Sequence, residues 1–404
     1  MKIAIMHSGN IGFFPRYYKF LSESIEKRGD TIKLFCPNSG RNNRNTLPNQ
    51  VTFGTRLNWF IHHNLYNITG LQDIYSFIDT FHLIYLLKQY KPDVIHLNVV
   101  NDYMLNFPLF VNFTNKHNIP VVWTMHDCRA FTGRCSHFEE FKCMRWKNGC
   151  GHCPLPKQYG ASWLDNSSIQ WHLRNKYIYR FKQLLVITPS QWLLNYVKDS
   201  LLNKFPMKCI YNGVDIDIFS KPSSFNFKEK YKLQGKTIIL GLALNMDRLK
   251  GLDYFIRLSK DLPPKFQIVL VGGVRNNDIS KIPSNIILLP RTTSVEELAA
   301  IYQAATIFVN PTLIDNFPTT NIEALASGTP VVTFQTGGSA ESIDKNSGIS
   351  VPKGDYNALI RAIQEIAENI HIYSRENCLL RAQQFSLKQF DKYVDLYHQL
   401  ILSK

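Results

Sequence analysis

The stretch of residues 306–334 constrains the fold of this chain more than any other segment. It reads as an apolar strand, a polar turn, a short helix and a second apolar strand, with Gly328 as a stop signal just past the helix. The turn carries Asp315 and the helix carries Glu323. The pattern therefore puts two acids and a helix N-terminus at the carboxyl edge of a parallel sheet, where open α/β sheets bind nucleotides.

Glu323 has a second interpretation. Thr320 and Glu323 have the spacing of a capping box, in which a glutamate bonds back to the backbone at the start of its helix. Capping does not account for Asp315, which lies five residues before this box. The residues alone leave both roles open for Glu323 and favour a ligand contact for Asp315.

The same alternation of strands and helices runs along the whole chain and predicts parallel sheets covered on both faces. In the first half we expect strands at 2–6, 31–35, 93–97, 120–124 and 184–188. In the second half we expect strands at 237–244, 267–272, 285–289, 306–309 and 330–334, and helices at 250–261, 294–304, 319–327 and 355–369. The predicted fold class is α/β, with two Rossmann-like doubly wound domains that face a central cleft.

Composition excludes several classes of protein. The 404 residues are 45% hydrophobic and 19% charged, which is ordinary for a globular protein of two or three domains. No apolar run approaches the ~20 residues of a membrane span, and no secretory signal is visible. We therefore expect a cytoplasmic enzyme, peripheral on the inner membrane face. The net charge of +15 indicates an anionic partner without choosing between nucleotides, lipids and nucleic acid.

Asp315-(seven residues)-Glu323, followed by Ala-Leu-Ala-Ser-Gly-Thr-Pro-Val-Val, resembles the acid-x7-Glu signature of retaining glycosyltransferases of family 4 (glycosyltransferase group 1). The resemblance implies the GT-B fold and a nucleoside diphosphate-sugar donor. It also implies that Glu323 holds the ribose hydroxyls and that Asp315 contacts the donor sugar. The chain departs from the signature in two places, with Asp315 where glutamate is usual and Pro318 where glycine is usual.

Further donor-binding residues follow from that resemblance. Arg248 and Lys250 lie where the family has its diphosphate clamp, and cations beside a helix N-terminus suit a diphosphate. Without the resemblance, such a motif is more often a solvated helix end. Thr319 and Thr320 begin the helix whose N–H groups would meet the distal phosphate, and Arg291 lies where the family backbone contacts the nucleobase.

In the first half, His126 ends a predicted strand at its carboxyl edge. A lone histidine is more often a satisfied polar residue, but the fragment His126-Asp-Cys-Arg-Ala-Phe-Thr-Gly resembles a family subgroup that makes surface polysaccharides. The resemblance implies catalytic roles for His126, Lys250 and Asp315. Gly12 follows the first strand, where a backbone without side chain can approach a phosphate or the acceptor. No nucleophile and no catalytic metal are expected.

Four cysteines are clustered at Cys135, Cys143, Cys150 and Cys153. The terminal C-x2-C with two more cysteines nearby suits a structural zinc site in a reducing compartment. Two disulfides or free thiols packed in a loop are the alternatives. Zinc would staple a long insertion after His126 and leave no position open for chemistry.

The predicted organisation has three parts. Residues 1–213 form an acceptor-side domain with a cysteine-rich insertion at 127–160, residues 214–385 form the nucleotide-sugar-binding domain, and residues 386–404 form an amphipathic helix that packs back on the first domain. The predicted function is a retaining hexosyltransferase. It would move a sugar from a nucleoside diphosphate-sugar to a saccharide or polyprenyl-diphosphate-linked acceptor, in capsule, exopolysaccharide or O-antigen synthesis.

Two alternatives remain from the sequence. One is a GT-B nucleotide-sugar epimerase or hydrolase, and the other is a zinc-stapled nucleic-acid-binding protein. The basic residues form no dense block and the paired acids would repel phosphate, so no nucleic acid partner is expected. Aromatic and basic residues interleave at 13–20 and 56–60, which suits docking on an anionic membrane, although such rings are most often core.

Overall fold

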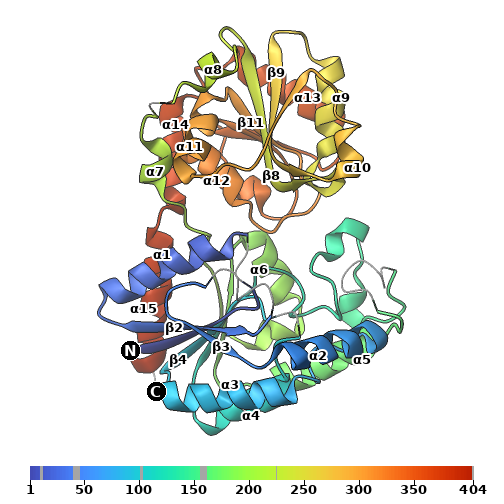
Figure 1. Cartoon of the computed structure of the whole chain (residues 1–404), viewed down its shortest axis with the longest axis vertical. Helices are drawn as coiled ribbons and strands as arrows, with labels where there is room; N and C mark the ends of the chain where they lie inside the picture. The colour runs from blue at the N-terminus through green and yellow to red at the C-terminus, as the bar shows by residue number, and fades with distance from the viewer. Residues whose placement is uncertain (10–11, 40–45, 101–102, 155–161, 224, 403–404) are drawn as a thin grey trace. The chain divides into compact units, whose positions relative to one another are not determined.

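A computed structural model describes residues 1–9, 12–39, 46–100, 103–154, 162–223 and 225–402. The chain divides into two compact units, which are described separately (Figure 1). Unit 1 comprises Met1–Ile210 and Phe390–Lys404, and unit 2 comprises Tyr211–Gln389. Within the described residues, no helix is both long and apolar enough to cross a bilayer.

Unit 1 is built on a seven-stranded sheet with the order β3-β2-β1-β4-β5-β6-β7, and all its pairings are parallel. Its central strands are apolar and buried on both faces, as parallel strands covered by helices require. The strands are β1 (Lys2–Met6), β2 (Thr31–Pro37), β3 (Gln50–Phe53), β4 (Val94–Leu97), β5 (Val121–Thr124), β6 (Leu184–Thr188) and β7 (Met207–Cys209). The α-helices from the first part of the chain are α1 (Phe14–Lys27), α2 (Arg56–Thr69), α3 (Phe77–Tyr90), α4 (Phe107–Lys116), α5 (Ser167–Ile178) and α6 (Gln191–Lys198).

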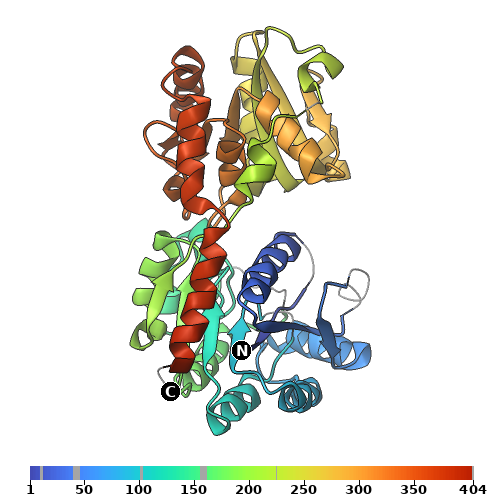
Figure 2. The same ribbon diagram turned by 90° about the vertical axis from the view of Figure 1, so that its left-hand side faces the viewer.

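The last helix, α15 (Lys388–Leu402), packs on unit 1 beside α1 (Figures 1 and 2). Its Tyr397 hydroxyl lies 2.6 Å from Nδ1 of the fully buried His96, and His96 Nε2 lies 2.8 Å from the Thr124 hydroxyl. Asp391 accepts a hydrogen bond from Ser24 on α1 at 2.6 Å. Buried polar contacts and aromatic packing thus hold the C-terminal helix against the first unit.

Unit 2 has a six-stranded parallel sheet with the order β10-β9-β8-β11-β12-β13. Its strands are β8 (Thr237–Met246), β9 (Phe266–Val274), β10 (Ile286–Leu289), β11 (Ile307–Asn310), β12 (Val331–Phe334) and β13 (Gly348–Val351). Its α-helices are α7 (Ile216–Ser220), α8 (Phe227–Lys230), α9 (Leu252–Asp261), α10 (Asn276–Ile279), α11 (Val295–Ala304), α12 (Thr319–Ala326), α13 (Tyr356–Glu368) and α14 (Arg375–Ala382). The reversal of strand order beside β8 puts the loops after β8 and β11 next to each other at one edge.

The predicted fold class is confirmed: two Rossmann-like units with parallel sheets, and a C-terminal helix that returns to the first unit. Every strand expected from the sequence is present. The strands that the sequence did not reveal are β3, β7 and β13, and each of them is an edge strand. Edge strands are only half covered, so they lack the continuous apolar run of a central parallel strand.

Candidate active site

In unit 2, three loops meet at the carboxyl edge of the sheet, after β8, β11 and β12. Leu313 donates its N–H to the Leu249 carbonyl at 2.8 Å, which ties the β11 loop to the β8 loop. Gly338 donates its N–H to the Asn316 carbonyl at 2.9 Å, which ties the β12 loop to the β11 loop. These hydrogen bonds hold the residues that follow three neighbouring strands in one place.

Lys250 and Asp315 form an ion pair at this edge. The Lys250 ammonium lies 3.0 Å from Oδ2 of Asp315 and 3.3 Å from the Ile314 carbonyl. Asp247 positions the lysine, because its carboxylate caps the β8 turn by accepting the Lys250 backbone N–H at 3.1 Å. The side chains remain 38% and 22% exposed, so both charges can be reached from solvent. The structure brings together these two residues, which the sequence predicted for one site.

Glu323 lies on α12 and is only 3% exposed. Its Oε2 accepts a hydrogen bond from the Tyr302 hydroxyl at 3.2 Å. The capping-box interpretation is wrong, because Thr320 is inside the helix and the N-cap is Pro318, which makes no side-chain cap. Thr319 and Thr320 form the first turn of α12, where the first N–H groups of a helix have no intrahelical acceptor.

A buried amide network that the sequence did not indicate fixes α12 in place. Asn310, the last residue of β11, donates to Asn321 Oδ1 at 2.8 Å, and Asn321 donates to the Ser342 hydroxyl at 3.0 Å. All three side chains are buried. Because buried amides need partners, this network sets the position of the helix start relative to the sheet. An asparagine at the end of an apolar strand was the one available signal.

Gly337 lies against the same loop and has a positive φ of 55°. A Cβ atom there would lie 1.7 Å from the Asp315 carbonyl oxygen, so no larger residue fits without moving the Asp315 loop. Gly337 thus permits the close approach of the β12 loop to Asp315.

Only one of the two arginines predicted for the donor site lies next to Lys250. Arg248 is exposed on the β8 loop, near enough to Tyr254 that its charge opposes the rise in the pKa of Tyr254 that burial causes. Arg291 is exposed after β10, and β9 separates that edge strand from β8. The fold therefore puts Arg248 beside Lys250 in the same turn and leaves Arg291 two strands away.

In unit 1, polar residues follow the neighbouring strands β1, β4 and β5. His126 Nε2 lies 3.1 Å from the Asn98 side-chain oxygen, and its ring meets Tyr17 edge-on with centroids 5.4 Å apart. Burial lowers the pKa of His126 to about 4, against the opposing charge of Asp127. At neutral pH the ring is uncharged, so it can accept or donate one hydrogen bond. Asn98, which the sequence did not single out, orients this ring.

Gly12 lies in unit 1 with a φ of 70°, and a Cβ atom there would meet nothing within 4 Å. The glycine is therefore needed for the backbone conformation and not for space. Residues 10–11, which precede Gly12, lie outside the described residues. Gly9 donates its N–H to His7 Nδ1 at 3.0 Å, which places this loop next to the buried His7.

Unit 1 should lose stability in mild acid, because burial lowers the pKa of His96 to about 3 and that of His126 to about 4. The unfolded chain then binds more protons below pH 6.5, so stability is complete above pH 6.5 and falls as pH drops from there. Titration of His96 alone should lower the free energy of unfolding by about 2 kcal/mol at pH 5. Calorimetric melting from pH 8 to 5 should show the loss, and His96→Gln should flatten the slope of melting temperature against pH. His371→Gln, at an exposed histidine of unit 2, should leave the slope as in wild type.

The cysteines at 135, 143, 150 and 153 form no disulfides. A hydrogen bond with Cys153, burial and the neighbouring thiols all raise the pKa of Cys135, and burial raises that of Cys150 to about 11. In the part of the chain that the structure describes, no group of three or more His, Cys, Asp or Glu is arranged to hold a metal ion. The structure thus does not support the zinc interpretation. Residues 155–160 of the predicted insertion lie outside the described residues.

Aromatic packing connects the cysteine-rich segment to the core of unit 1. Trp146 is buried with its ring centroid 4.9 Å from that of Phe131 and 5.3 Å from that of Phe138. Both phenylalanines are also buried, and all three rings belong to the core cluster of unit 1. Apolar burial therefore holds this segment to the core of unit 1.

Comparison with known protein families gives evidence that is independent of this geometry. A family model described as Glycosyltransferase Family 4 matches residues 15–218, and one described as Glycosyl transferases group 1 matches residues 236–369. The first match alone covers just over half of the chain. The chain belongs to glycosyltransferase family 4.

Among curated proteins, this glycosyltransferase is 25% identical over 323 residues to the putative colanic acid biosynthesis glycosyl transferase WcaC of Escherichia coli (strain K12). That match covers 76% of this chain and 77% of the relative. It is also 28% identical to the D-inositol 3-phosphate glycosyltransferase of Mycobacteroides abscessus, but over only 35% of each chain.

Among solved structures, the glycosyltransferase is similar to sucrose-phosphate synthase from Thermosynechococcus elongatus, with a TM-score of 0.72 and 18% identity over the full length of both chains. It is also similar to Anabaena Alr3699/HepE in complex with UDP and glucose, with a TM-score of 0.69 and 15% identity over 99% of both chains. At these identities the likeness concerns the fold, which is GT-B.

Proposed function

We propose that this glycosyltransferase transfers a sugar, with retention of anomeric configuration, from a nucleoside diphosphate-sugar to a saccharide acceptor. The acceptor would be lipid-linked, and the product would be a surface polysaccharide such as capsule, exopolysaccharide or O-antigen. The relation to a putative colanic acid biosynthesis enzyme supports the polysaccharide product. The UDP complexes of a structural neighbour support a uridine nucleotide as the first donor to test.

The observation that carries the proposal is the ion pair between Lys250 and Asp315. Asp315 lies four residues before the start of α12. A departing diphosphate needs fixed positive charge, and an ammonium beside a helix N-terminus supplies charge and N–H donors together. Asp315 holds the ammonium in place before the donor binds. It would then bond a donor sugar hydroxyl, while Glu323 would hold the ribose.

The retaining step does not require a nucleophile from the protein. In the proposed front-face route the acceptor hydroxyl attacks on the side from which the diphosphate leaves, and its proton passes to a phosphate oxygen. Lys250, Arg248 and the first turn of α12 would stabilise the negative charge that builds up on the leaving group. His126, uncharged at neutral pH, would hold a substrate hydroxyl by a hydrogen bond.

Thermal-shift measurements with nucleotides and nucleotide-sugars test the donor, because a ligand that binds only the folded state raises the melting temperature. At a donor concentration 100 times its dissociation constant we expect about 2.7 kcal/mol of stabilisation, or a shift of about 5 °C or more. Absence of a shift with every common nucleoside diphosphate-sugar would contradict the proposal. Release of nucleoside diphosphate with free sugar, but without transfer to any saccharide, would favour a hydrolase.

A further inference from the structure

Helices α2 and α3 expose an unusual number of large apolar side chains to solvent. On α2 the exposed residues repeat every three or four positions, opposite the buried His62 and Tyr66, and the same is true of α3 opposite Leu83 and Leu87. The exposed apolar residues of the two helices are Leu57, Phe60, Ile61, Ile68, Phe77, Ile78, Phe81 and Tyr85. Helices that merely cover a sheet expose polar residues on this side, so these faces are suited to a further partner.

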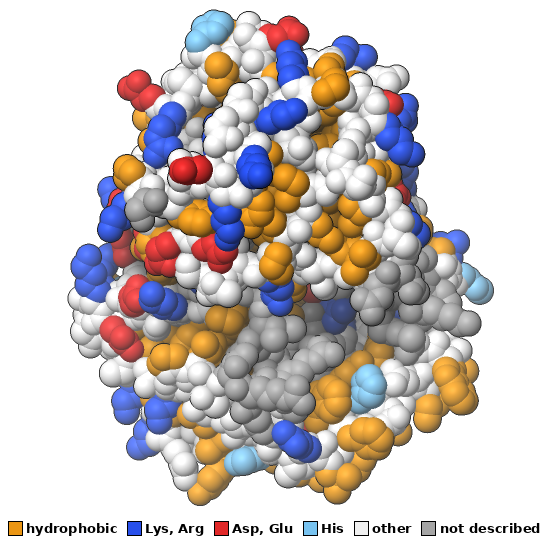
Figure 3. Space-filling view, turned by 45° about the horizontal axis from the view of Figure 1, so that its top comes forward, with side chains coloured by type: hydrophobic (Ala, Val, Ile, Leu, Met, Phe, Trp, Pro, Cys, Tyr) orange, Lys and Arg blue, Asp and Glu red, His pale blue; other side chains and the backbone are white. Residues whose placement is uncertain are grey.

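The two faces form one surface, here called the α2–α3 face. Asn58 on α2 donates to Asp79 on α3 at 2.9 Å, which joins the N-terminal turns of the helices. At the other end of α2, the N–H of Trp163 donates to the Asn67 carbonyl at 2.8 Å, and the N–H of Leu164 donates to the Ile68 carbonyl. Trp163 is 89% exposed, so it extends the apolar surface beyond the end of α2. Hydrophobic side chains also gather at the lower right of the space-filling view, on the side where Figure 1 shows α2 (Figure 3).

The charge around the α2–α3 face is mainly positive. Residues 51–92 contain two acids, Asp73 and Asp79, and both are buried. The exposed charged residues of this segment are Arg56, Lys88 and Lys91. The exposed acids next to the segment are Asp93 and Asp165, whose carboxylates accept the backbone N–H groups of Lys2 and Cys153. A surface with exposed rings and aliphatic chains and a mainly basic border complements an anionic lipid surface.

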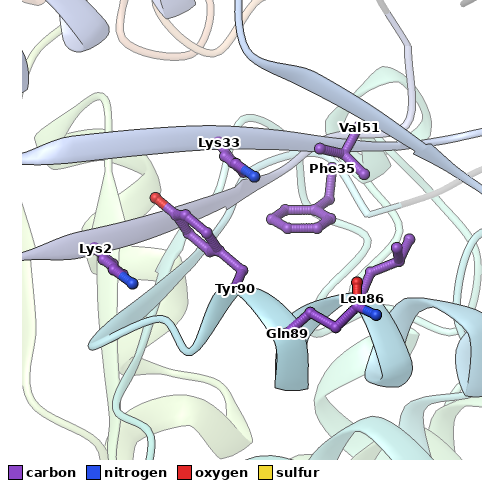
Figure 4. A pocket seen from close by; sticks show the side chains of 7 residues that line it. All are labelled: Lys2, Lys33, Phe35, Val51, Leu86, Gln89 and Tyr90. Carbon is purple, nitrogen blue, oxygen red and sulfur yellow. The ribbon is translucent and has the colours of Figure 1, made fainter.

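A basic pocket of about 340 Å³ opens on the flank of α3 next to this surface (Figure 4). Lys2 and Lys33 line this pocket, and their ammonium groups lie 6.0 and 5.0 Å from the centre of the Tyr90 ring. The Tyr90 hydroxyl bonds the carbonyls of Ile3 and Thr31, which fixes the ring between the lysines. Among the described residues, neither lysine forms an ion pair with an acidic side chain.

Leu86 and Gln89 connect the pocket to the α2–α3 face. Both line the pocket, and they follow the exposed Tyr85 by one and four residues, which puts them on the adjoining side of the same helix. An apolar surface that enters the lipid tails would therefore bring the pocket to the level of the headgroups. Two ammonium groups beside an apolar wall suit a phosphate that carries an acyl or prenyl chain.

We propose that the α2–α3 face docks unit 1 on an anionic membrane and that the Lys2–Lys33 pocket takes a lipid phosphate. The inference rests on the proposed function only in one respect, since a lipid-linked acceptor gives the docking a purpose. The segment at 13–20 does not take part through its central rings, because Phe14, Tyr17 and Tyr18 are buried in the core. For this first aromatic segment the core interpretation holds, whereas the segment at 56–60 belongs to the docking face.

Vesicle flotation of the full chain tests the surface. Wild type should float with phosphatidylcholine vesicles that contain about a third phosphatidylglycerol, and bind at least tenfold less to pure phosphatidylcholine. The triple variant Phe60→Ser, Ile78→Ser, Phe81→Ser should lower binding at least tenfold. The matched control Ile370→Ser, Ile372→Ser, Leu380→Ser removes three exposed apolar residues of unit 2 and should bind as wild type does.

A second pair of variants tests the pocket. Lys2→Gln with Lys33→Gln should reduce the preference for anionic vesicles at least fivefold, whereas Lys345→Gln with Lys353→Gln, which removes the same charge from unit 2, should not. Equal loss with both pairs would mean that net charge and not the pocket selects the lipid.

Two results would overturn docking on a membrane. One is that the wild-type protein stays in the soluble fraction at every lipid composition. The other is a concentration-dependent dimer, seen by sedimentation, that only the triple serine variant abolishes, since a second copy would then cover the face. The melting-temperature shift produced by the nucleotide-sugar should be the same in all variants, so a failure here is distinguishable from a failure of the proposed function.

Discussion

Replacing Lys250 by alanine should lower kcat/KM for sugar transfer by about 10²- to 10³-fold, the usual cost of losing one preorganised group that stabilises developing charge. The lysine ammonium is 3.0 Å from Asp315 and would face the departing diphosphate. The melting temperature should change little, because a partly exposed ion pair contributes only about 0 to 1 kcal/mol to stability. Steady-state kinetics and thermal melting on the same preparations separate these two effects.

Lys260→Ala is the matched control for this prediction, since Lys260 is an exposed lysine on α9 of the same unit. Its kinetics should equal those of wild type. Activity of Lys250→Ala within threefold of wild type would show that the ammonium does not act on the leaving group. A large loss of melting temperature in this variant would instead give the Lys250–Asp315 pair a structural role.

Replacing Glu323 by glutamine should weaken binding of the donor about 10- to 100-fold, because a hydrogen bond to a charged group contributes about 1.5 to 3 kcal/mol. Glutamine has the same shape and its amide oxygen can still accept the Tyr302 hydroxyl, so the packing of α12 should survive. The loss should appear in the dissociation constant of the nucleoside diphosphate as well as in that of the sugar nucleotide. Isothermal titration with both ligands measures it.

Tyr302→Phe is the companion variant, since it removes the hydroxyl that bonds Glu323 and leaves the carboxylate. It should weaken donor binding less than Glu323→Gln does, because tyrosine acts by positioning the acid. If the nucleotide binds Glu323→Gln as tightly as wild type, the ribose contact is wrong. Glu323 would then be a buried acid that only orders the start of α12.

Much of the fold could be predicted because the signals are local. Strands such as β1, β5 and β6 are apolar runs that stay apolar on both faces, and glycine or proline marks the ends of the helices between them. The edge strands β3 and β7 gave no such signal, since a half-covered strand needs no continuous apolar run.

The candidate site was predicted less completely. Spacing along the chain indicated Asp315, Glu323 and Lys250, but it also suggested a capping box that α12 does not form. Asn98, Tyr302 and Asn321 orient the predicted residues and carry no motif of their own. They were missed because an asparagine or tyrosine becomes a positioning group only through the neighbour that the fold gives it.

The amino-acid order thus determines the class of fold and the identity of the charged groups, since hydrophobic periodicity and helix stop signals act over a few residues. The tertiary structure decides which of these groups meet. Lys250 and Asp315 are 65 residues apart and pair only because β8 lies next to β11 in the sheet. His96 and Tyr397 are 301 residues apart and meet only because α15 returns to unit 1. Strand order and helix docking depend on the burial of whole surfaces, and no local pattern contains that information.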